Sequence, residues 1–252
     1  MKACRQRPLG KTRIFWMPAA MLFAAVSLPA LVHAEAPETE RQMLSGQGPD
    51  DAIPWDFVID GSRKAGQPSK IPVPSNWQQQ GFGHYQYGYD KGPRASDRAV
   101  YSRSFTVPAA WKGRTIRIVF DGVMTDALVK VNGTIAGPVH QGGFNRFSHD
   151  VTALVKPGEE NRLEVEVSEA SAAHDTDIAE RHGDYWVFGG IYRPVWLEAA
   201  PAQAIAHVAI DAQASGALSA DVALAAPRTV TRVVGQWPEV CELRTVAPLV
   251  LV

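Results

Sequence analysis

The sequence predicts an all-β fold, most simply a two-sheet sandwich whose strands follow a jelly-roll order. Apolar and polar side chains alternate along most of the chain, and turn-forming residues separate the alternating segments at short intervals. No window of a dozen residues shows the apolar spacing of an amphipathic helix. Many short strands separated in this way are typical of sandwiches.

Three segments show the alternation most clearly, namely 99–107, 114–123 and 161–169. Their apolar faces are formed by Tyr101, Phe105 and Val107, by Ile116, Ile118 and Phe120, and by Leu163, Val165 and Val167. Arg103 is the single polar exception on these faces. Segments of this kind are half-buried strands with their apolar side turned to the core.

Turn residues lie where these strands end. In ALVKVNGTIAG, residues 127–137, two strand halves meet at Asn132-Gly133. This dipeptide tolerates positive φ at both positions, so it predicts a β-hairpin with a primed turn. The segments 121–123 (DGV) and 156–161 (KPGEEN) are further predicted breaks.

Residues 1–34 predict a secretory signal peptide. Five basic residues precede an apolar run, 14–31, and Val32-His33-Ala34 follows as a cleavage site. An uncleaved membrane anchor is the alternative, since the run is near the lower length limit for spanning, but Pro18, Pro29 and the cleavage site favour removal. We therefore expect a secreted or periplasmic protein with no membrane association after cleavage.

Cleavage after Ala34 would change the composition. It would leave 218 residues and remove five positive charges and no acid, which takes the formal net charge from −1 to −6. This balance gives no broad attraction for nucleic acid. Cys4 would be lost and Cys241 retained, so no internal disulfide is expected and the protein depends on its apolar core.

The chain divides into several predicted parts. Residues 35–52 are polar without periodicity and predict a disordered leader, and residues 53–202 form the main β domain. A small-residue linker near Ala199 precedes the apparent first strands of a second β domain, 203–252. From Val233 onward we find no turn signals or alternation, and 50 residues are too few for most sandwich domains, so we expect this domain to be truncated.

Three ordered segments resemble the N-terminal sugar-binding domain of glycoside hydrolase family 2, which includes β-galactosidases, β-mannosidases and β-glucuronidases. They are IPVPSNWQQQGFGHYQY (71–87), RSFTVPAAWKGRTIRIVFDGVMTDALVKVNGTIAG (103–137) and DYWVFGGIYRPVWLEA (184–199). The resemblance covers roughly Ile53 to Ala202. Residues 207–213 (HVAIDAQ) are similar to the start of the family's next domain, which is immunoglobulin-like.

The resemblance implies a galactose-binding-like jelly roll, an immunoglobulin-like sandwich and then a (β/α)₈ barrel. The barrel carries both catalytic glutamates that retaining hydrolysis needs. Since this sequence ends before a barrel could begin, we expect no catalytic residue and no unaided hydrolysis. The resemblance implies a domain that binds a β-glycoside and docks on a catalytic barrel that this chain lacks.

The resemblance makes Asp184 the first candidate for the sugar site. In β-galactosidases of the family, an Asp before an aromatic pair and a Gly-Ile-aromatic-Arg segment reaches into the active site. A carboxylate can accept hydrogen bonds from sugar hydroxyls while a neighbouring ring stacks on the apolar sugar face. The alternative is that Asp184 caps a turn or pairs with Arg181 or Arg193.

Three aromatic residues complete the predicted site. Tyr185 and Trp186 follow Asp184 and are expected to supply the stacking face, with core packing as the alternative. Tyr87 lies where a family loop often lends an Asn to the subsite, and that substitution weakens a claim for galactose in particular. The pair Gly189-Gly190 predicts a bend that presents the rings, and Trp77 is expected to pack in the core.

The segment 174–184, HDTDIAERHGD, is rich in potential metal ligands, but its spacing matches neither H-E-x-x-H nor a calcium loop. We expect a solvated loop there, with no metal site and no cofactor. Two other functions stay open, since fold alone does not assign a role. One is a free-standing carbohydrate-binding module, and the other is a structural sandwich used for docking.

Overall fold

The computed structural model describes residues 38–61, 64–89, 97–202, 204–224, 229–236 and 244–250. The predicted signal peptide and both cysteines lie outside these residues. Within the described part, no helix has the length and apolar character needed to cross a membrane.

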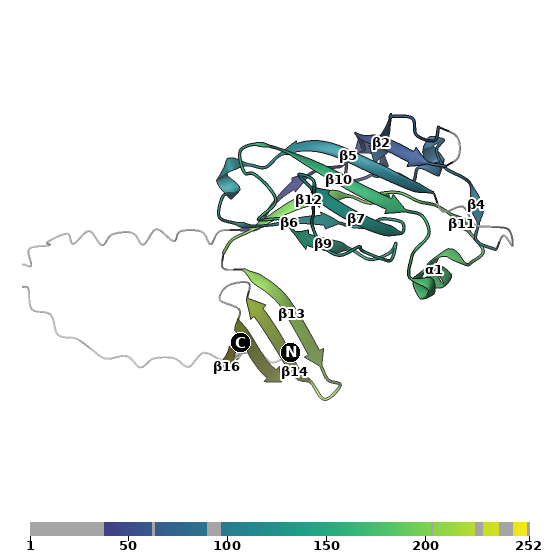
Figure 1. The fold of residues 1–252 in the computed structure, drawn as a ribbon. Coiled ribbons are helices and arrows are strands. Elements are labelled where there is room, and N and C mark those ends of the chain that lie inside the picture. The colour runs from purple at the N-terminus through teal and green to yellow at the C-terminus, as the bar shows by residue number, and fades with distance from the viewer. Residues whose placement is uncertain are drawn as a thin grey trace, which may run out of the picture. The chain divides into compact units, whose positions relative to one another are not determined.

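Two antiparallel sheets form the main domain (Figure 1). The four-stranded sheet has the order β1 (Glu40–Met43), β12 (Val195–Ala200), β6 (Thr115–Phe120) and β9 (Phe147–Asp150). The six-stranded sheet has the order β3 (Ser69–Val73), β2 (Ile53–Asp60), β5 (Arg98–Thr106), β10 (Glu160–Ser168), β7 (Asp126–Val131) and β8 (Thr134–Ile135). Strands that are distant in sequence are neighbours in both sheets, and the predicted all-β sandwich is confirmed.

The apolar faces predicted from the alternation form the core. The three segments become β5, β6 and β10, and all nine of the apolar side chains predicted to face inward are buried. Facing residues of β2 complete the layer, with the ring of Phe57 lying 4.9 Å from that of Tyr101 in an edge-on contact. Burial of this surface is the main stabilising contribution to the domain.

The exceptional Arg103 is accommodated on the inner face. Its guanidinium lies 5.9 Å from the centre of the Trp55 ring, within reach of a cation–π interaction. Partial burial lowers the pKa of Arg103 from its ordinary value, although the group stays charged at neutral pH.

The prediction that residues 35–52 are a disordered leader is wrong for the part of this segment that the structure describes. Residues 40–43 form β1 and pair with β12 in the register Glu40↔Ala199 to Met43↔Trp196. The carboxylate of Glu40 accepts hydrogen bonds from the Trp111 indole at 2.9 Å and from Arg114, which together lower its pKa. The strand shows little apolar periodicity because it is an edge strand with exposed side chains. The next residue, Leu44, is the one that packs into the core.

The Asn132-Gly133 hairpin is confirmed between β7 and β8. Both turn residues have positive φ, 52° at Asn132 and 79° at Gly133, as a type I′ turn requires. A Cβ at Gly133 would meet nothing within 4 Å, so only the backbone conformation restricts this position.

We expect Gly133→Ala to lower the free energy of unfolding by about 1 kcal/mol, because an L-residue is strained at positive φ. Gly48→Ala is the matched control, since Gly48 is extended at φ −161° and has equally open space around its Cβ position. Urea unfolding of both variants measures the difference, and equal stabilities would contradict the conformational explanation.

Residues after the linker form a separate antiparallel sheet. Its strands β13 (Ile205–Ala212), β14 (Ala217–Leu224), β15 (Thr229–Gln236) and β16 (Arg244–Val250) follow one another in sequence order. The two strands predicted first are present as β13 and β14. The segment beyond Val233, in which the sequence shows no alternation, also contributes a strand, since β16 pairs with β15 with an irregular register between Thr231 and Arg232.

Candidate functional site

A two-residue ladder brings the predicted site residues together. Strand β11 (Trp186–Val187) pairs with β4 (Gln86–Tyr87), which places Trp186 opposite Tyr87. The Tyr87 hydroxyl donates a hydrogen bond to Oδ1 of Asp184, and the Tyr87 and Trp186 rings lie 5.5 Å apart at an angle of 66°. Three residues predicted from two distant segments therefore form one contiguous group.

Both Asp184 and Trp186 face solvent. Asp184 is exposed, and Trp186 exposes 55% of its surface, whereas the other described tryptophans are buried. An exposed indole beside a carboxylate provides the flat apolar face and the acceptor that sugar recognition uses. The alternative in which Asp184 pairs with Arg181 is wrong, because Arg181 is buried and its guanidinium donates to Glu169 Oε1 at 3.3 Å and to the Phe188 carbonyl at 2.8 Å.

The fourth predicted residue, Tyr185, lies on a neighbouring surface. Its hydroxyl donates to the backbone carbonyl of Glu180 at 2.8 Å. Together with Trp186 it lines a pocket of about 280 Å³. The remaining residues around this pocket are Asn76, Met124, Phe144, Glu180, Arg181, Val187, Phe188 and Tyr192. Trp186 thus connects the Asp184–Tyr87 pair with an aromatic pocket.

The aromatic group is larger than the sequence analysis predicted. The ring of Tyr85 lies 6.2 Å from those of Trp186 and Phe188, and the ring of Tyr89 lies 6.3 Å from that of Tyr87. Tyr85 and Tyr89 are exposed. A signal was present in the sequence, because tyrosines at every second position, 85, 87 and 89, favour one face of an extended segment.

Two glycines allow the loop to approach the core. A Cβ at Gly189 would lie 2.2 Å from the Trp77 ring, and Gly190 has a φ of 123°. Trp77 is fully buried, as predicted. The bend predicted at the glycine pair is therefore explained by a close approach at one position and a positive φ at the next.

The predicted solvated loop at 174–184 is wrong over most of its length. Residues His174–Arg181 form helix α1, eight residues long, with Asp175 and Asp177 in its first turn. Acidic side chains there interact favourably with the helix dipole. The helix is too short to give an apolar stripe in the sequence. Among the described residues, no group of three or more potential ligands could hold a metal ion.

Comparison with known proteins identifies the domain. Residues 62–201 match the family model described as "Glycosyl hydrolases family 2, sugar binding domain". The chain belongs to glycosyl hydrolase family 2. A β-galactosidase of Thermoanaerobacter pseudethanolicus is 43% identical over 100 residues, which cover 39% of this chain and 13% of that protein. A β-glucuronidase of Bacteroides fragilis is 33% identical over 143 residues, which cover 57% and 19%.

Solved structures agree with the fold of the family 2 domain. The β-glucuronidase of Ruminococcus gnavus aligns with a TM-score of 0.59 at 18% identity, over 84% of this chain and 39% of that one. At that identity the likeness concerns the fold alone. The chain spans less than a fifth of the length of the two curated relatives above.

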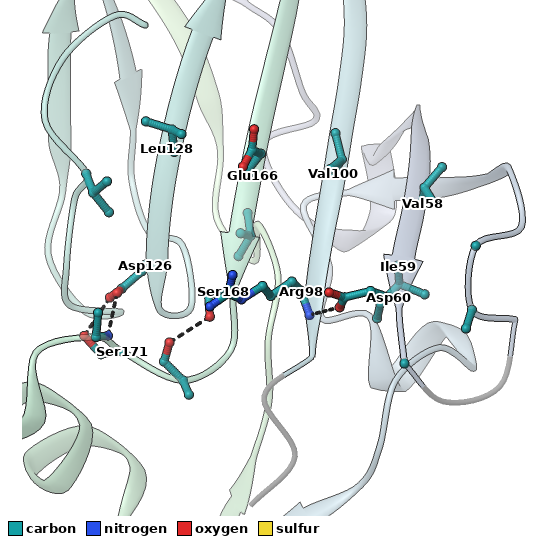
Figure 2. A pocket seen from close by; sticks show the side chains of 17 residues that line it. Val58, Ile59, Asp60, Arg98, Val100, Asp126, Leu128, Glu166, Ser168 and Ser171 are labelled. Carbon is teal, nitrogen blue, oxygen red and sulfur yellow. Dashed lines mark hydrogen bonds between the residues drawn. The ribbon is translucent and has the colours of Figure 1, made fainter.

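The family 2 domain also has a larger groove, of about 900 Å³, on the outer face of the six-stranded sheet (Figure 2). Val58, Val100 and Leu128 line it, and Asp126 is occupied by hydrogen bonds from Ser171 at 2.6 Å and from the Ala172 amide. None of the described residues that line it is aromatic, and none belongs to the predicted site. It therefore lacks the stacking face that the Trp186 group provides.

Proposed function

We propose that this chain is the exported N-terminal sugar-binding part of a family 2 glycosidase. In this proposal it helps to recognise a β-glycoside, while bond cleavage depends on a catalytic barrel outside this sequence. The observation that carries the proposal is the contiguity of Asp184, Tyr87 and the exposed ring of Trp186. Export is supported by the signal-peptide pattern of residues 1–34.

The chemistry of recognition follows from the contacts. The hydrogen bond from Tyr87 fixes one oxygen of Asp184, so the carboxylate has a defined direction and further lone pairs for sugar hydroxyls. Trp186 offers its face to the apolar side of the sugar ring. Holding the sugar in this way would orient the glycosidic bond for two distant carboxyl groups, which is a positional contribution to catalysis.

The surroundings of the site support docking on another protein surface. Tyr85, Tyr89, Trp186 and Phe144 are exposed aromatic side chains on or near the loops that form the site. Exposed aromatic groups of this kind are typical of surfaces that a partner covers. We propose that the catalytic barrel is this partner and that it closes the sugar site.

Titration of the full chain with D-galactose, D-mannose and D-glucuronate tests the proposal. We expect a saturable change in tryptophan fluorescence with a Kd of about 1–10 mM, since in this proposal the catalytic barrel supplies the rest of the site. The two neutral sugars should bind better than glucuronate, because Asp184 repels a second carboxylate. Asp184→Asn should weaken binding by about tenfold through loss of a charged acceptor.

Asp175→Asn is the control, since it removes the same charge from an exposed position on helix α1. It should bind as the wild type does. A Kd below about 0.1 mM would instead favour a free-standing carbohydrate-binding module. Absence of saturation at about 50 mM of every sugar, or unchanged affinity of Asp184→Asn, would contradict the proposed role.

A further inference from the structure

One peptide unit of the site loop is held at both of its polar ends by buried side chains. The carbonyl oxygen of Phe188 accepts a hydrogen bond from Nη1 of Arg181 at 2.8 Å. The amide of Gly189, which belongs to the same peptide unit, donates to Oε1 of Gln78 at 3.0 Å. The unit follows directly after strand β11, which carries Trp186.

Glu169 joins the two side chains that hold this unit. Its Oε1 accepts from Nε2 of Gln78 at 3.0 Å and lies 3.3 Å from Nη2 of Arg181. The exposed fractions of Gln78, Glu169 and Arg181 are 1%, 1% and 3%. Gln78 belongs to η2 (Gln78–Gln80), Glu169 directly follows β10, and Arg181 is the last residue of α1, so the three side chains connect three separate parts of the chain.

The position of Glu169 is itself fixed by backbone hydrogen bonds. Its amide donates to the carbonyl of Asp97 at 2.9 Å, and its carbonyl accepts from the Thr125 hydroxyl at 2.8 Å. A buried side-chain network on such an anchor has little freedom to rearrange. The loop is therefore tied through Gln78 and Arg181 to a rigid point beside the six-stranded sheet.

Such an arrangement is an inefficient way to stabilise a fold. Burying the Arg181 guanidinium and the Glu169 carboxyl group removes their hydration, and apolar residues of the same volume are often at least as stabilising. Oε2 of Glu169 is buried without a hydrogen bond to any described residue. The network does fix the orientation of the 188–189 peptide unit, because its carbonyl oxygen and its amide are both hydrogen-bonded to buried side chains.

We propose that Gln78, Glu169 and Arg181 are positioning residues of the sugar site, which hold peptide unit 188–189 and thereby set the placement of Trp186 and Asp184. This inference rests on the proposed function for its consequence in binding. None of the three residues needs to touch the sugar. Their effect passes through the loop backbone to strand β11 and the ring that it presents.

Gln78→Leu tests the proposal in the full chain. The substitution keeps the size of the side chain but leaves the Gly189 amide without its acceptor, so we expect exchange of that amide to become at least about tenfold faster by NMR. We expect the Kd for D-galactose or D-mannose to rise by about tenfold as well, because the loop no longer holds one placement.

Two further variants separate positioning from general stability. Val131→Ala removes buried volume at the end of β7, opposite Leu163, which is six residues along the chain from Glu169, and should leave Gly189 exchange and sugar affinity within about twofold of wild type at a comparable loss of stability. The double variant Gln78→Glu with Glu169→Gln exchanges the two side chains. An amide at position 169 can then donate to a carboxyl at position 78, which still offers an acceptor to the Gly189 amide. The double variant should recover slow exchange and most of the affinity.

The outcomes distinguish this inference from the proposed function. If the wild type binds none of the sugars, the proposed function is wrong, and the exchange rates alone then decide whether Gln78 holds the loop. If Gln78→Leu leaves Gly189 exchange unchanged, the positioning role is overturned. It is also overturned if the wild type binds a sugar and Gln78→Leu exchanges Gly189 faster but binds that sugar equally well. Equal losses of sugar affinity in Val131→Ala and Gln78→Leu would likewise overturn it.

Discussion

Gly189→Ala is expected to lower the free energy of unfolding by about 3 kcal/mol. The new methyl group would lie 2.2 Å from Cζ2 of Trp77 and 2.7 Å from its Cη2. Trp77 cannot move away easily, because it is fully buried and its amide donates to the Gly189 carbonyl at 3.1 Å. Either the ring or the loop must shift, and each change disrupts close-packed surroundings. Urea denaturation of the full chain measures the loss.

The double variant with Trp77→Phe provides the matched test of this explanation. Phenylalanine lacks the outer ring atoms that the alanine methyl would meet, so the two substitutions should be less damaging together than the sum of their separate effects. We expect a coupling free energy of at least about 1 kcal/mol in this double-mutant cycle. Strict additivity, or a Gly189→Ala protein as stable as wild type, would show that the close approach does not restrict this position.

Glu169 is expected to make the domain less stable as the pH rises through the neutral range. Desolvation raises the pKa of its carboxyl group from 4.5 to about 8; the charges of Arg181 and the hydrogen bond of Gln78 oppose this shift, and Asp97 adds to it. Below pH 4.5 the group is protonated in both the folded and unfolded protein, and its contribution to stability is fully present. Between these values the unfolded chain ionises first, so the contribution is lost by about pH 8.

The expected size follows from the width of this window. Each unit of pKa difference corresponds to ~1.4 kcal/mol, so the loss between pH 5 and pH 8 is on the order of 3 kcal/mol. Glu169→Gln has nearly the same shape and does not titrate, which makes it the reference. We expect the stability of the wild type relative to this variant to fall steadily over that range in urea denaturation. Parallel stability profiles of the two proteins would contradict a raised pKa.

The parts of the fold that the sequence predicts are those in which one strand face is buried and the other is solvated. Strands β5, β6 and β10 satisfy that condition, and so their alternation is plain in the sequence. Strand β1 does not, since an edge strand with exposed side chains shows no apolar period. Helix α1 is not predicted from the sequence, because its eight residues make only about two turns and leave no apolar pattern over a window of a dozen residues.

The site divides in the same way. Asp184, Tyr185, Trp186 and Tyr87 could be proposed from the resemblance, but their contact could not, because Tyr87 and Asp184 are 97 residues apart in the chain. The network of Gln78, Glu169 and Arg181 gave no sequence signal at all. Its members are separated by loops and become neighbours only through the packing of the sheets, and buried polar residues look like surface residues in a sequence.

The register that couples Glu40 to Ala199 has a consequence for the order of events during synthesis. The first strand of the domain has its partner in the last one, so a growing chain cannot close this sheet until the ribosome has added nearly the whole domain. Pairings this distant in sequence form slowly and leave apolar surface accessible in the meantime. If the protein is exported as proposed, that delay would keep the polypeptide unfolded long enough to pass through a translocation channel.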